Sequence, residues 1–140
     1  MVLHPLALLL AASPSPSLDT ARADFAAQRD EFRRVHSATV RDHLHAAESI
    51  LRERDVSSWS LDRRRRRELS LNALRSYWQE GDFPWDDDQL FDAPIFVDDD
   101  GTHCAVAEIL RFNGKTELVD TVREIQNLGF VSDLAAIDGV

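Results

Sequence analysis

The densest group of residues that could do chemistry is the segment FVDDDGTHCAVAEIL, which begins at Phe96. It holds three consecutive aspartates, a glycine, and a histidine beside Cys104, the only cysteine of the chain. Neighbouring carboxylates can bind a cation, and a cysteine at a helix start can act as a nucleophile because the helix dipole lowers its pKa. Asp-Gly clusters also form turns. The segment therefore permits a calcium loop, a thiol site or a structural turn.

The spacing of the oxygen donors limits the calcium interpretation. An EF-hand loop needs ligands at positions 1, 3, 5 and 12 and Gly at position 6. With Gly101 at position 6, Asp98 and Asp100 fall at positions 3 and 5. Positions 1 and 12 hold Phe96 and Ala107, whose side chains have no oxygen to bind calcium. What remains is a looser cation-binding acidic loop made of four aspartates: Asp86, Asp88, Asp98 and Asp100.

The thiol interpretation pairs Cys104 with a histidine of an upstream helix, His36 or His43. Three nearby aspartates disfavour a thiolate, and a free cysteine more often packs as a small hydrophobe. We therefore expect a structural role for Cys104 and keep a cysteine-dependent hydrolase or thiol enzyme as the alternative. The sequence shows no coherent triad, metal set or phosphate loop, so no cofactor is expected.

Composition points to one small domain and argues against a nucleic-acid partner, which leaves a protein partner as an open alternative. A chain of 140 residues that is 44% hydrophobic suits a single core. Its formal net charge of −9 opposes binding to the phosphate backbone. The run RRRRR at 63–67 fans around a helix, and eight aspartates follow between Asp82 and Asp100. We expect the arginines to pair with this acidic stretch, with an external partner as the competing idea.

The N-terminal residues resemble a signal peptide. Residues 1–17 contain no Asp, Glu, Lys or Arg, and an apolar run from Leu6 to Ala12 precedes Ser-Pro repeats. Ala21, Arg22 and Ala23 form an A-x-A cleavage pattern. Residues 1–23 are thus interpreted as a signal peptide with a Ser/Pro linker, and the product as periplasmic or secreted. The run is too short to span a bilayer.

Helical periodicity dominates the rest, which we interpret as one domain over residues 24–140. Residues 18–56 contain neither Gly nor Pro and predict one long helix or two stacked ones. The apolar residues of this stretch recur at helical spacing and form one stripe: Phe25, Phe32, Val35, Val40, Leu44, Ala47 and Leu51. A second helix, capped by Ser60 and stopped at Gly81, has these apolar positions: Leu61, Leu71, Leu74, Tyr77 and Trp78.

The C-terminal third alternates loops and short helices. Two Pro-containing stretches predict a loop with at most a short strand or hairpin near residues 94–97. Helices are expected over residues 105–112 and 116–127, and a final turn over 134–137 is capped by Ser132 or Asp133. The predicted fold is mainly α, a single small helical domain.

Several segments in order resemble a family of small exported bacterial proteins of unassigned activity. These are LNALRSYWQEGDFP, PIFVDDDGTHCAVAEIL, NGKTELVDTVREIQN and FVSDL, which cover about residues 44–137. The family pattern is Pro-x-Phe-x-Asp-x-x-Gly-x-x-Cys-Ala-[Val/Met]-[Gly/Ala], and Ala107 stands where Gly is commoner. The resemblance implies export and a mostly helical fold, and it assigns no catalytic residue. Its positions here are Tyr77, Gly81, Phe83, Pro84, Pro94, Phe96, Asp98, Gly101, Cys104, Ala105, Gly114, Leu118 and Asn127.

The expected function is that of a non-catalytic, exported binding or structural module without a membrane span in the mature chain. The thiol enzyme using Cys104 is the alternative, and the cation-binding acidic loop is a third hypothesis.

Overall fold

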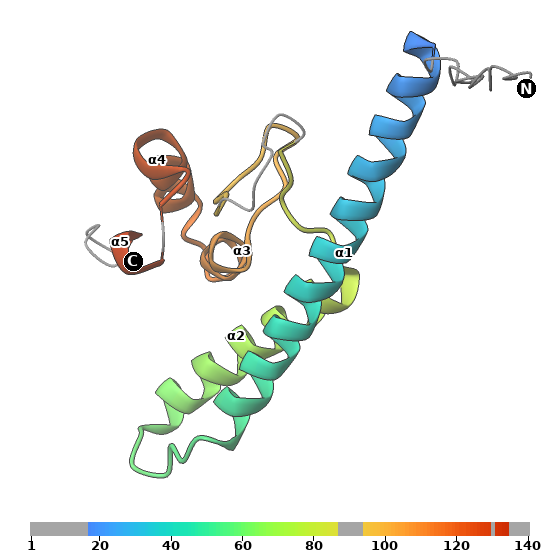
Figure 1. Cartoon of the computed structure of the whole chain (residues 1–140). Coiled ribbons are helices and arrows are strands. Elements are labelled where there is room, and N and C mark those ends of the chain that lie inside the picture. Colours follow the sequence, from blue (N-terminus) through green and yellow to red (C-terminus); the bar gives the residue numbers. More distant parts are fainter. Residues whose placement is uncertain (1–16, 87–93, 130, 135–140) are drawn as a thin grey trace, which may run out of the picture. The chain divides into compact units, whose positions relative to one another are not determined.

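The computed structural model describes residues 17–86, 94–129 and 131–134 (Figure 1). Its elements are α1 (Leu18–Glu53), α2 (Leu61–Glu80), α3 (Ala105–Phe112), α4 (Thr116–Gln126) and the short α5 (Val131–Leu134). Extended pairing in the described residues is limited to one antiparallel bridge, between Val97 and His103. The predicted mainly helical fold with little sheet is confirmed.

The chain divides within α1 into a short unit, Met1–Phe32, and a larger unit, Arg33–Val140. In the short unit, the described part is the first half of α1. The Ser17 hydroxyl accepts a hydrogen bond from the Thr20 amide at 3.2 Å and so starts the helix. The predicted cleavage pattern at 21–23 lies in this helix, whereas the apolar run at 6–12 lies outside the described residues. In the part of the chain that the structure describes, no helix is long and apolar enough to cross a membrane.

The long helix α1 is continuous, and in its second half the predicted apolar stripe is only partly buried. Val35 and Leu51 on that stripe are 48% and 39% exposed. The buried residue of α1 is Glu48, at 1% exposure. The stripe also has half-buried members: Val40, Leu44 and Ala47. Glu48 lies on the same helix face, so the predicted stripe faces the protein in this half of α1 but has a carboxylate as its most buried member.

Helix α2 has the predicted ends. The Ser60 hydroxyl accepts from the Arg63 amide at 3.3 Å, and Gly81 has a left-handed φ of 73° while its amide donates to the Tyr77 carbonyl. Arg41 of α1 adds a further cap, since its Nε donates to the Trp78 carbonyl at 3.2 Å. The predicted core position Leu61 is 78% exposed, because it belongs to the outward side of the first turn.

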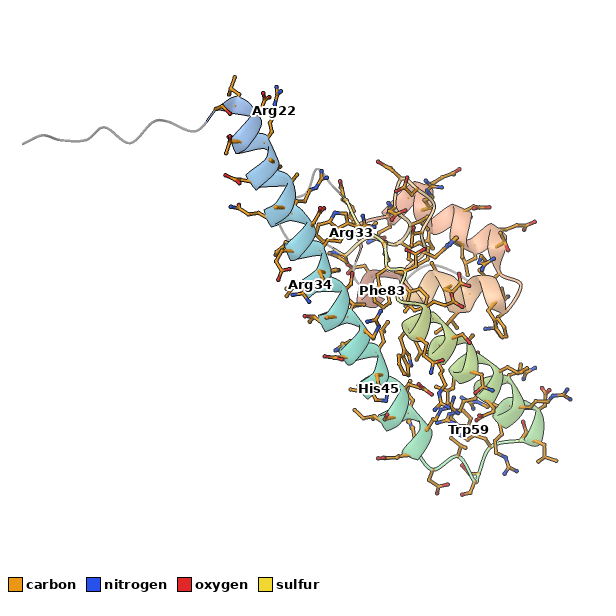
Figure 2. All side chains as sticks on the ribbon, turned by 90° about the vertical axis from the view of Figure 1, so that its right-hand side faces the viewer. Arg22, Arg33, Arg34, His45, Trp59 and Phe83 are labelled. Atoms are coloured by element: carbon orange, nitrogen blue, oxygen red, sulfur yellow. The ribbon has the colours of Figure 1, made fainter. Side chains whose placement is uncertain are left out.

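The apolar core lies where α3 and α4 meet the segment before α3, and α2 packs against α3. One buried cluster comprises Phe96, Val97, Ala107, Val119 and Val122. Phe83, just past the end of α2, packs edge-on to Tyr77 with ring centroids 5.4 Å apart (Figure 2). Ala107 has no exposed surface, so a small residue is required there.

Residues 96–104 form a tight reversal that leads into α3. The Asp98 amide donates to the Thr102 carbonyl at 3.0 Å, and Gly101 adopts a φ of 84°. The Asn127 side chain accepts from the Val97 amide at 3.0 Å and donates to the Val97 carbonyl at 2.9 Å. Asn127 thus acts as a neighbouring strand would, which explains why the extended segment needs no sheet.

Candidate functional site

The acidic loop uses its most buried carboxylate to hold the turn. Asp98 is 6% exposed, and its two oxygens accept from the Thr102 amide at 2.7 Å and the Trp85 amide at 3.1 Å. Asp100 is exposed, and Asp86 is half-buried. Asp88, the fourth proposed ligand, lies outside the described residues. Within those residues, no three His, Cys, Asp or Glu side chains gather as a metal-binding group.

Cys104 precedes α3 and packs against the core cluster. Burial raises the pKa of its thiol, and the backbone amides of Ala107 and Val106 only partly oppose this shift. Neither candidate histidine is shown beside the sulfur: His36 lies against the Trp85 ring, with centroids 5.4 Å apart, and His43 is exposed on α1. These observations describe a thiol of low reactivity, and the thiol-enzyme hypothesis stays a prediction.

Three members of the arginine run have described partners outside the acidic stretch, and Asp87, Asp88 and Asp92 of that stretch lie outside the described residues. Arg63 lies over the Trp59 ring, 3.9 Å from its centroid, and Trp59 stands in the turn before α2 (Figure 2). Arg66 pairs with Asp62 at 2.7 Å. Arg67 donates to a carbonyl of α1, that of Leu51. The first two contacts join residues four apart and so need no loop ordering, whereas the third joins α2 to α1.

A buried carboxylate that the sequence analysis did not single out joins α1 to α2. Glu48 accepts from Arg52 Nε at 2.5 Å, from Arg75 Nε and Nη2 at 2.9 Å, and from Trp78 Nε1 at 2.7 Å. We call these four residues the Glu48 cluster. Burial raises the pKa of Glu48, but donation from Arg52 and Trp78 and the charge of Arg75 outweigh it and leave the pKa below its usual range.

The Glu48 cluster continues along the facing sides of the two helices, which run antiparallel and side by side (Figure 1). Arg52 also donates to Glu68 at 2.7 Å and to Asn72 at 2.9 Å. His45 of α1 lies against the Trp78 ring with centroids 4.7 Å apart (Figure 2). Arg52, Arg75 and Trp78 each donate to a protein acceptor, so this polar joint is interpreted as structural rather than as a ligand site. The sequence signal was the pair Glu48 and Arg52 at i, i+4, which share a helix face.

One surface suited to a ligand is a groove between α2 and α3. Two adjoining cavities, of about 300 and 310 Å³, share the lining residues Tyr77, Glu80 and Glu108. The acidic end of this α2–α3 groove adds Asp82, Asp100, His103 and Arg111. The apolar end adds Leu69, Ala73 and Phe112.

The groove floor is rigid and its rim is charged. The Tyr77 hydroxyl donates to the His103 carbonyl at 2.8 Å, and burial raises the pKa of this phenol, so it stays protonated. Arg111 donates to both oxygens of Glu108, at 2.6 and 3.0 Å, which lowers the pKa of that carboxyl. Four carboxylates therefore line the groove against one guanidinium, and the net charge of the groove is negative.

Sequence analysis missed this groove because its residues come from distant segments. Leu69 and Phe112 are 46% and 53% exposed, which single-sequence periodicity cannot tell from core positions. Comparison of the chain with protein-family models, curated proteins and solved structures finds no match. The geometry of the described residues therefore carries the functional argument.

Proposed function

We propose that the chain is an exported, non-catalytic binding module whose binding surface is the α2–α3 groove. The observation that carries this proposal is the combination of an exposed apolar pair, Leu69 and Phe112, with an acidic end in one continuous lining. Exposed apolar side chains beside a cavity are typical of protein-binding surfaces. Catalysis is not favoured, because the buried carboxylates and the thiol are occupied by structural contacts.

The chemistry of the groove defines the class of partner. A leucine or aromatic side chain fits against Leu69, Ala73 and Phe112, and an arginine or lysine one turn away faces Glu80 and Asp82. The partner is therefore a peptide segment, helical or extended, that carries apolar and basic residues four positions apart. A polyanion has no place in this groove, since its carboxylates would repel it.

A labelled peptide tests the proposal. We expect a fluorescein-labelled helical peptide with two Leu-Arg pairs at i, i+4 to bind in fluorescence anisotropy. A matched peptide with Glu in place of Arg should not bind. Glu80→Gln and Asp82→Asn should each weaken binding by up to about fivefold, because each removes one rim ion pair. Asp120→Asn, on the exposed side of α4, makes the same change in charge and should leave binding unchanged.

Two outcomes would contradict the groove proposal. One is equal binding of the Arg and Glu peptides. The other is equal loss of binding in Asp120→Asn and Glu80→Gln, since binding would then follow overall charge rather than the groove.

Export is a separate part of the proposal. The uncharged apolar start, the A-x-A pattern and the resemblance to small exported bacterial proteins support it. Mass spectrometry of the exported product should find a mature N-terminus between about residues 13 and 24. Intact Met1 in cytoplasmic protein would refute export and leave the groove proposal standing.

A further inference from the structure

The outward side of α2 carries a regular stripe. Its members recur at spacings of four, four, three, four and four residues: Leu61, Arg65, Leu69, Asn72, Ser76 and Glu80. Such spacing keeps side chains on one face of a helix. The buried residues Leu71, Leu74 and Tyr77 lie on the opposite side of α2. The stripe therefore points away from the apolar core, and its member Asn72 also accepts a hydrogen bond from Arg52 of α1 at 2.9 Å.

The stripe is complementary to itself when reversed. Its midpoint falls between Asn72 and Ala73, so Arg65 and Glu80 are equally far from it, about 11 Å along the axis at 1.5 Å per residue. Leu69 and Ser76 are likewise equidistant from the midpoint. Two α2 helices in antiparallel contact thus place Arg65 of each beside Glu80 of the other, with a leucine over a small residue between them.

The same arrangement fills the apolar end of the groove. Ala73 and Ser76 line the cavity of about 310 Å³, together with Leu69 and Glu80. Leu69 of a second copy, opposite Ser76, therefore lies over this cavity. The small side chains of Ala73 and Ser76 let two helices approach closely.

The arginine run supplies the complementary charge. Three of its members are engaged: one stacks on Trp59, one pairs with Asp62, and one donates to the Leu51 carbonyl. Arg65 has no ion pair or hydrogen-bond partner among the described residues, and neither does Glu80. Two opposite charges at the two ends of one exposed stripe favour a second stripe in the reverse direction.

We propose that the occupant of the α2–α3 groove is a second copy of this chain, docked antiparallel along α2 about a two-fold axis. The contact is isologous, so each copy gives Arg65 and Leu69 and receives them at Glu80 and Ser76. This inference rests on the proposed binding function of the groove and names its partner. The interface is small and partly polar, so the dimer is weak and forms at micromolar or higher concentrations.

Sedimentation equilibrium of the full chain in 0.15 M salt tests the dimer. We expect a monomer–dimer equilibrium in the wild type. Arg65→Glu and Glu80→Arg should each raise the dimer dissociation constant about tenfold or more, because two ion pairs become two repulsions. The double variant R65E/E80R should return it to within about threefold of wild type, since both pairs re-form with exchanged signs.

The control is the neighbouring residue Arg64, which lies about 100° around the helix from the stripe. Arg64→Glu makes the same change in net charge and should leave the dimer dissociation constant within about twofold of wild type. Circular dichroism should show unchanged helix content in all four variants, since Arg64, Arg65 and Glu80 are exposed.

Three results would overturn self-association through α2. They are a monomer at every concentration up to about 1 mM, equal effects of Arg64→Glu and Arg65→Glu, and failure of the double variant to restore the dimer. If the monomer still binds the Leu-Arg peptide with the expected Glu80 dependence, the groove function stands and its partner is another protein. If the peptide also fails to bind, both proposals fall.

Discussion

Replacing Glu48 by alanine should destabilise the protein by about 3 kcal/mol. Breaking a buried ion pair costs about 3 to 5 kcal/mol, and a donor that loses its acceptor costs about 1 to 3. Arg52 and Arg75 have side chains 24% and 51% exposed, so both guanidinium groups can regain water. Trp78 Nε1 loses its acceptor at 2.7 Å. Because both guanidinium groups regain water, the total stays at the lower end of the range for a buried ion pair, about 3 kcal/mol.

Urea unfolding followed by circular dichroism at 222 nm measures this effect. For a domain of this size, a loss of about 3 kcal/mol corresponds to a melting temperature lower by about 10 °C. The matched control is Glu53→Ala, which removes a carboxylate from an exposed position of the same helix. Its effect should stay within about 0.5 kcal/mol.

A second substitution separates charge from hydrogen bonding. Glu48→Gln keeps one acceptor oxygen but turns an amide NH₂ toward two guanidinium groups, so a loss of about 2 kcal/mol is expected. If Glu48→Ala unfolds within about 0.5 kcal/mol of the wild type, the Glu48 cluster does not hold α1 to α2 and the reasoning fails. If Glu48→Gln alone is neutral, the negative charge is not what matters.

The pH dependence of the same variant follows from the lowered pKa of Glu48. A carboxyl group with a folded-state pKa below its unfolded value stabilises the fold above that unfolded value, about 4.3. This contribution is lost as pH falls through the folded-state pKa. The difference in unfolding free energy between wild type and Glu48→Gln should therefore be constant from about pH 8 to 5 and shrink at lower pH. A difference that grows on acidification would contradict this sign.

Three further changes test other parts of the fold. Asn127→Ala should lower the unfolding free energy by about 2 kcal/mol in urea titrations. The reason is that the buried Val97 amide loses its acceptor and the Val97 carbonyl loses its donor. An unchanged unfolding free energy would show that the Asn127 contacts do not stabilise the fold. Cys104 should react with iodoacetamide at pH 7 at least about tenfold slower in the folded than in the urea-unfolded chain, and a faster folded-state reaction would revive the thiol enzyme. Gly81→Ala should lower the unfolding free energy more than Gly101→Ala does in the same titrations. Both glycines have a positive φ, but only at Gly81 would a Cβ meet a side chain, that of Arg41. Equal losses would show that the Arg41 side chain moves aside freely.

Much of the helical architecture could be predicted because its signals are local. Ser60 and Gly81 delimit α2 through contacts within four residues, and these caps do not depend on the rest of the fold. The bounds of α3 and the turn at Gly101 follow from similar short-range chemistry. The final turn is an exception, since α5 begins at Val131, before the predicted residue 134.

The candidate site could not be predicted to the same extent. The groove needs Leu69 from α2 and Phe112 from α3 on one surface, and only the packing of these helices brings them together. The described partners of the arginine run were not predicted, because charge density along the chain does not show the contacts with Trp59 and the Leu51 carbonyl. Pairing with the acidic stretch remains a prediction. The resemblance to exported proteins and the signal peptide remain predictions.

The sequence by itself determined where helices begin and end, since propensity, caps and glycine conformations act over a few residues. Only the tertiary structure decided which residue of a helix face is buried most deeply. On α1 the apolar stripe predicted the face of Val40, Leu44 and Ala47, yet the most buried residue of that face is Glu48. Arg75 and Trp78, about 30 residues away, supply the donors that a buried carboxylate requires. Hydrogen-bond partners so distant in sequence produce no periodic pattern near Glu48, so the burial of this charge could not be predicted from the sequence around it.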